Sequence, residues 1–221
     1  MRRTMETKMG FGITYGGGGD FTPIVRYDAR AGRIFRDDKK DGIKTPVDIT
    51  QTFAAVVDFE QLEVGWIHFP MGAAPDFRMV PFGQDPGPRP SDGHKQGVRF
   101  LMRLSGACGG DVREFSTTAA AALGGWDRVH DEYLKTKGSQ PGMLPVVKML
   151  NATPVTTTGK HGSSTNYMPE FAITSWVKRP DDLPIKEAAQ PARQPFSAPP
   201  ATGSTAVPPP QPALAGADDF G

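Results

Sequence analysis

The stretch GVRFLMRL, residues 97–104, contains the clearest strand pattern in the chain. Apolar side chains occupy every second position from Val98 to Leu104, and arginine stands at two of the positions between them. Successive side chains of a strand point to opposite faces of a sheet, so one face enters a core while the other presents Arg99 and Arg103. The pattern predicts a strand with one buried face and one basic face.

Further short segments on both sides of this strand are rich in β-branched and aromatic residues and are separated by turn residues. They are residues 24–27, 33–36, 52–59, 64–69, 77–82, 112–116, 146–150 and 171–177, and the last two are expected to be joined by a loop over residues 152–168. Short strands without alternating helices favour a mostly β fold, and we expect a small antiparallel barrel of OB type with extra strands. A β-sandwich is the alternative, because strand spacing alone does not separate the two architectures.

One segment has the pattern of an amphipathic helix. Its apolar side chains recur at steps of three and four residues, at Leu123, Trp126, Val129 and Tyr133. Ser116 or Thr117 is the expected N-cap, and the helix should end near Gly138. The pair Gly124-Gly125 inside the helix predicts a kink or a close contact, since glycine there costs about 1 kcal/mol relative to alanine.

From Leu183 onward the composition changes to proline and alanine, with few large apolar side chains. Such a segment cannot bury enough surface to offset the entropy of ordering, so residues 183–221 are expected to be a disordered spacer and residues 1–182 one domain. The spacer ends in Asp218, Asp219 and Phe220. Two carboxylates and one ring at the end of a spacer predict a tip that binds a partner protein, with the acids on a basic rim.

Composition excludes several classes of function. The 25 basic and 24 acidic residues nearly cancel, so only the distribution of charge bears on nucleic-acid binding. Cys108 is the single cysteine, which agrees with a reducing cytoplasm. No stretch is apolar enough to span a membrane, and no nucleotide loop, metal-ligand spacing or catalytic motif occurs. We therefore expect no catalytic residue, no metal, no cofactor and no enzymatic activity.

Binding of single-stranded nucleic acid without sequence preference needs cations along the phosphates and rings on which bases stack. The chain places rings beside cations at several expected strands and loops. The candidate DNA-binding residues are Arg26, Tyr27, Arg33, Phe35, Arg36, Arg99, Arg103, Lys160 and Tyr167. Among these, Tyr27, Phe35 and Tyr167 are the expected stacking rings and the others the expected phosphate contacts.

The segment GKHGSSTNYMPEF (residues 159–171), the following WVKRP (residues 176–180) and the glycine- and arginine-rich opening resemble phage-encoded OB-fold single-stranded DNA-binding proteins. The acidic tip with Phe220 is similar too, although Gly221 follows the ring that usually ends such tails. The resemblance implies protection of single-stranded DNA and recruitment of replication or recombination proteins through the tip, in the cytoplasm of a bacterial host.

Two other classes of function stay open from the residues alone. The first is a β-rich phage structural or assembly protein, and the second is an enzyme whose acids come from distant strands. Homo-oligomer formation is open as well.

Overall fold

The computed structural model describes residues 22–40, 43–159 and 162–185. This part of the chain is mostly β with one α-helix, which confirms the predicted class. Its elements are β1 (Ile24–Asp28), β2 (Arg33–Lys40), β3 (Ile43–Asp48), β4 (Ala54–Val57), η1 (Phe59–Gln61), β5 (Glu63–His68), β6 (Asp76–Pro81), β7 (Lys95–Leu104), η2 (Gly106–Cys108), β8 (Val112–Thr117), α1 (Ala120–Thr136), η3 (Lys137–Ser139), β9 (Met143–Gly159) and β10 (Gly162–Lys178). Strand β3 has no counterpart among the predicted strands.

All ten strands of the described residues belong to one sheet, in the order β10-β9-β4-β7-β8-β1-β2-β3, with β5 and β6 attached at β7. The sheet is mixed, because β1 and β8 run parallel while the other pairs are antiparallel. Its end strands do not pair with each other, so the sheet is open and matches the expected barrel only approximately. Two separate sheets, as a sandwich needs, are not formed by the described strands.

The core lies between one face of this sheet and α1. Phe100 on β7 and Phe115 on β8 both contact the indole of Trp126, with ring centroids 4.9 and 5.2 Å apart. Phe171 on β10 stacks on the same indole, with ring centroids 4.1 Å apart. The apolar stripe predicted for the helix is therefore its buried face. The core assignments that the sequence makes for Phe100 and Trp126 are confirmed.

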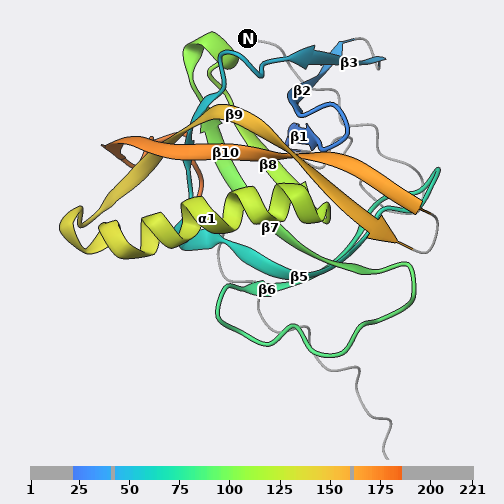
Figure 1. Cartoon of the computed structure of the whole chain (residues 1–221). Helices are drawn as coiled ribbons and strands as arrows, with labels where there is room; N and C mark the ends of the chain where they lie inside the picture. Colours follow the sequence, from blue (N-terminus) through green and yellow to red (C-terminus); the bar gives the residue numbers. More distant parts are fainter. Residues whose placement is uncertain (1–21, 41–42, 160–161, 186–221) are drawn as a thin grey trace, which may run out of the picture. The chain divides into compact units, whose positions relative to one another are not determined.

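The helix α1 packs against β10 (Figure 1). Its paired glycines make that contact close. A Cβ atom on Gly125 would lie 2.4 Å from the carbonyl oxygen of Pro169, so any side chain there would overlap the strand. The predicted close contact is thus confirmed. The predicted N-cap is wrong, because the helix begins after Ala119 and Thr117 instead accepts a hydrogen bond from the Ala119 amide.

The long strands β9 and β10 form a two-stranded ribbon (Figure 1). Strand β9 pairs with the rest of the sheet only at Val146–Lys148, where it meets β4. Beyond that point β9 and β10 pair with each other as far as Gly159 and Gly162. Residues 152–168, expected as a loop, are therefore mostly strand, because threonine and serine are accommodated in a ladder that needs no buried face.

The chain after β10 is tied to the sheet. Leu183 is 2% exposed and packs with Leu101 and Leu144, and Asp182 pairs with Arg103. The compact unit consequently runs to Ile185, three residues past the predicted boundary. The rest of the predicted tail lies outside the described residues. None of the helices among the residues that the structure describes is long and apolar enough to cross a membrane.

Candidate functional site

Most of the arginines expected to contact phosphates lie on the face of the sheet that is turned away from α1. On β7, Phe100 contacts Trp126 of the helix, so the neighbouring Arg99 points to the opposite face. On β1, Val25 is buried in the same core, so Arg26 also points away from the helix. We call this surface the outer face. Strand register places the following candidates on it: Arg26, Arg33, Phe35, Arg99 and Arg103.

Several of these side chains stand in one row across neighbouring strands. Phe35 pairs with Arg26, and Ser116 pairs with Arg99, which pairs with Glu63. The register of β1 with β8 puts Arg26 level with Ser116, because Ile24 pairs with Glu114. Neighbouring strands lie roughly 4.8 Å apart, so the row from β2 to β7 spans roughly 14 Å. It crosses the strands at right angles.

Two arginines of the row lie over aromatic rings. The guanidinium of Arg26 is 4.7 Å from the centre of the Phe35 ring, and that of Arg99 is 4.7 Å from the centre of the Phe77 ring. Such pairs combine a cation for a phosphate with flat surfaces for a base. Phe77 was not among the sequence candidates. The sequence places Phe77 beside Arg78, but its cation partner in the fold is Arg99, because β5 pairs with both β6 and β7.

Carboxylates accompany every one of these arginines. Arg26 pairs with Asp37 at 3.2 Å, and Arg33 pairs with Asp48 at 3.0 Å. Arg99 lies 2.6 Å from Glu114 and 3.9 Å from Glu63. The positive charge of the outer face is therefore largely balanced, while the side chains of Arg26 and Arg33 stay 41% and 60% exposed.

Part of the outer face is covered by the end of the described chain. Arg103 donates from Nε to both carboxylate oxygens of Asp182, at 2.7 and 2.9 Å. Beside it, Leu101 is buried under Leu183, although the sequence predicted this face of the strand to stay basic and open. Arg103 is thus engaged in holding the C-terminal segment, and the open part of the face lies nearer Arg99.

Two of the predicted contacts, Tyr27 and Arg36, do not lie on the outer face, because their side chains point to the core face. Tyr27 is 8% exposed and donates its hydroxyl to the carbonyl of Tyr167, and burial, with the charge of Asp28 second, raises the pKa of Tyr27 to about 12. Arg36 donates to the carbonyl of Cys108 and pairs with Asp38. Neither side chain offers a free ring or cation, since alternation along β1 and β2 turns both inward.

Tyr167 is half-buried and belongs to the base of the ribbon. Its amide donates to the carbonyl of Ala29 at 2.6 Å, and its side chain lies against Gly32, where an added Cβ would be 3.0 Å away. Gly32 has φ of 67°, so this turn requires glycine for its backbone as well. The ring therefore anchors β10 to the β1–β2 turn. Lys160 and the tip residues Asp218, Asp219 and Phe220 lie outside the described residues.

The outer part of the ribbon has a composition that the sequence analysis did not use. Residues 151–169 include seven serines or threonines and no aspartate or glutamate. Thr156 and Thr165 face each other across the ribbon, with hydroxyl oxygens 3.4 Å apart, and both are exposed. The nearest carboxylate of the ribbon is Glu170, which accepts a hydrogen bond from Thr153. Beyond that pair, the outer part of the ribbon offers hydroxyl donors without acidic side chains, which suits contact with phosphates.

Within the described ranges, no group of three or more histidine, cysteine, aspartate or glutamate side chains is placed to hold a metal ion. Comparison of the chain with protein-family models, with curated proteins and with solved structures finds no match.

Proposed function

We propose that this protein binds single-stranded DNA without sequence preference and takes part in phage DNA replication or recombination. The observation that supports this most is the row on the outer face, where Arg26 over Phe35 and Arg99 over Phe77 alternate cations with rings. Bases stack on such rings whatever their identity, which accounts for tolerance of sequence.

The ribbon supports the same proposal from a second part of the fold. Its hydroxyl groups donate hydrogen bonds to phosphate oxygens, and it lacks acidic side chains from residue 151 to residue 169. Phosphate contacts of this type position a strand without reading its bases.

The carboxylates on the outer face lead us to expect only moderate affinity for DNA. A phosphate that approaches Arg26 competes with Asp37, and one that approaches Arg99 competes with Glu114. Few phosphates are then neutralised, so affinity should be moderate and should fall with salt along a shallow slope.

The tip Asp218-Asp219-Phe220 is part of the proposal through the sequence alone. We assign it to recruitment of replication or recombination proteins. Removal of residues 186–221 should leave the compact unit folded and should abolish capture of those partners.

A structural or assembly role in a phage is the second candidate. The pairing of the outer-face arginines with carboxylates favours this role, because a surface on which positive and negative charges are balanced also suits an interface with another protein.

Titration of labelled single-stranded and double-stranded oligonucleotides at several salt concentrations tests the proposal. We expect binding of single strands of unrelated sequence with similar affinity, weaker binding of duplex, and loss of affinity as salt rises. Equal affinity for duplex, or no binding at low salt, would favour the assembly role.

A further inference from the structure

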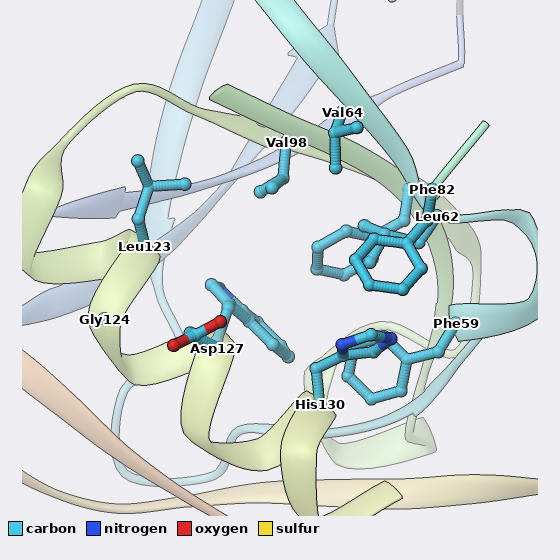
Figure 2. A pocket seen from close by; sticks show the side chains of 11 residues that line it. Phe59, Leu62, Val64, Phe82, Val98, Leu123, Gly124, Asp127 and His130 are labelled. Carbon is cyan, nitrogen blue, oxygen red and sulfur yellow. The ribbon is translucent and has the colours of Figure 1, made fainter. Parts of the chain in front are cut away.

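A cavity of about 260 Å³ opens between α1 and strands β5 and β7 (Figure 2). Its wall is mostly apolar and aromatic, with Phe59, Phe82 and His130 on one side and Leu123 on the other. A cavity of about 150 Å³ with an apolar lining already accommodates benzene, so this one has room for a whole apolar side chain.

The cavity continues into a second hollow along the same helix. The two share Phe59, Phe82 and His130, and the second extends past Tyr133 and Leu134. We call the two together the aromatic groove. Its mouth is formed by Phe82, which is 51% exposed and whose ring meets that of His130 at 4.6 Å.

One polar group in the wall of the groove has no partner. The indole Nε1 of Trp126 is buried and makes no hydrogen bond within the described part of the chain. A buried donor of this kind is costly unless an acceptor reaches it. This donor is not itself open to the cavity, so the lining of the groove suits an occupant that brings an apolar side chain.

The same chain exposes an apolar segment of matching chemistry. The turn between β5 and β6, residues 69–75 (FPMGAAP), contains Met71, which is fully exposed, and Phe69, which is 49% exposed. Methionine is flexible and its sulfur makes favourable contacts with aromatic rings, which line the groove. We call residues 69–75 the apolar turn.

The apolar turn cannot enter the groove of its own molecule. It follows the end of the β5–β6 hairpin where His68 pairs with Asp76, whereas the groove lies at the other end, where Glu63 pairs with Pro81. Five residue steps of strand separate the two ends, roughly 17 Å. The hairpin is hydrogen-bonded along this length, so only a second molecule can supply the turn.

We propose that the protein self-associates head to tail, with the apolar turn of one copy seated in the aromatic groove of the next and Met71 inside the cavity. Charge supports this arrangement. At the turn, Lys95 is an exposed cation beside the ion pair of Arg78 with Asp76, and the cavity is flanked by the exposed carboxylates Asp127 and Asp131, while Lys137 lies in the more distant hollow of the groove.

A head-to-tail contact between two different surfaces leaves one turn and one groove free until the copies close into a ring. Association then continues beyond the dimer, and copies line up in one direction. This inference does not rest on DNA binding, since neither the turn nor the groove uses the arginines of the outer face.

Analytical ultracentrifugation of the full chain without nucleic acid, over a wide range of concentration, tests the proposal. The wild-type mass should rise past that of a dimer. Met71→Glu, in which the altered side chain is fully exposed, should weaken association by at least about tenfold. Ile43→Glu is the matched control, because Ile43 is 69% exposed and lies on β3, away from both surfaces; it should associate as the wild type does.

The groove variant Phe82→Glu, with folding verified by circular dichroism, should weaken self-association to a similar extent. Mixed with Met71→Glu, it should form a one-to-one complex, since one protein keeps its turn and the other its groove. A wild type that stays monomeric or stops at the dimer, a Met71→Glu protein that associates normally, or a mixture without complex would each overturn the proposal.

Discussion

Arg179 donates hydrogen bonds from Nη1 and Nη2 to the two carboxylate oxygens of Asp58, at 2.7 and 3.0 Å. Asp58 is completely buried, and Arg179 stands directly after β10, 121 residues further along the chain. The hydrogen bonds to Asp58 raise the pKa of Arg179 above its ordinary value. The pair fixes the end of β10 to η1, next to the wall of the aromatic groove.

Arg179→Met should strongly destabilise the fold, because it leaves the Asp58 carboxylate buried with Gln61 as its remaining side-chain donor. Loss of one partner from a buried ion pair costs about 3–5 kcal/mol, and we expect the lower end of that range. Equilibrium unfolding in urea measures it. Arg33→Met is the control, since the pair of Arg33 with Asp48 is exposed and should contribute less than about 1 kcal/mol. Equal losses of unfolding free energy in the two variants would contradict the expected difference between a buried and an exposed ion pair.

Arg26→Ala should weaken binding of single-stranded DNA about equally for all sequences and reduce the slope of affinity against salt by about one. It removes a cation from the row and leaves Asp37 to repel the phosphate. Arg78→Ala removes the same charge from a side chain that is 64% exposed on the other face of β6. Fluorescence anisotropy should show normal binding for this control, and a loss equal to that of Arg26→Ala would place the DNA elsewhere.

Thr156→Glu introduces a carboxylate into the part of the ribbon that has none. We expect weaker DNA binding with unchanged thermal stability, because the side chain of Thr156 is exposed and its main contact is the Thr165 hydroxyl. Ser139→Glu adds the same charge at η3, distant in sequence from the ribbon and equally exposed, and should bind normally. Binding by both variants at the wild-type level would exclude the ribbon from the DNA site.

Gly125→Ala should destabilise the protein by about 1–3 kcal/mol, the usual cost of overpacking, since the added Cβ would meet the carbonyl oxygen of Pro169 at 2.4 Å. Gly138→Ala tests the same substitution where no atom lies within 4 Å, and its effect should stay within about 0.5 kcal/mol. Thermal unfolding of both variants measures the difference. A neutral Gly125→Ala would show that α1 can move away from β10.

The stability of the fold should fall as the medium becomes acidic, in part through His130. Burial lowers the pKa of His130 below its ordinary value of 6.5, and the charges of Asp131 and Asp127 oppose that shift only partly. Between the two pKa values the unfolded chain binds more protons, so the stabilisation is complete above about pH 6.5 and is lost as the pH falls through the folded pKa. Melting temperatures at about pH 7.5 and pH 5 should differ less in His130→Phe, which keeps a ring against Phe59. An unchanged pH dependence would assign the effect to other groups.

The sequence by itself determined the class of the fold and the identity of its buried face. Alternation along residues 97–104 and the three- and four-residue steps from Trp126 to Tyr133 are local patterns, and the burial they imply is found in the core between sheet and helix, whereas Leu123 is only half-buried and lines the cavity. Hydrophobic periodicity indicates which face of a helix or strand is buried, and that face depends only weakly on which other elements pack against it.

The same local signals failed where a strand has no apolar face. Residues 152–168 were expected as a loop because they are rich in threonine, serine and glycine, yet most of them pair as β9 and β10. Their regularity comes from the ladder between the two strands and from the anchor at Tyr167, which bonds to Ala29. Neither contact is visible in a window of neighbouring residues.

Only the tertiary structure decided which candidate side chains share a surface. Arg26 and Arg99 are 73 positions apart and meet on the outer face through the parallel pairing of β1 with β8. Adjacent Tyr27 points into the core, and Arg103 is engaged by Asp182. Composition specifies that cations and rings are present, but the register of strands distant in the chain sets which of them are free to bind, because a shift of one residue exchanges the two faces.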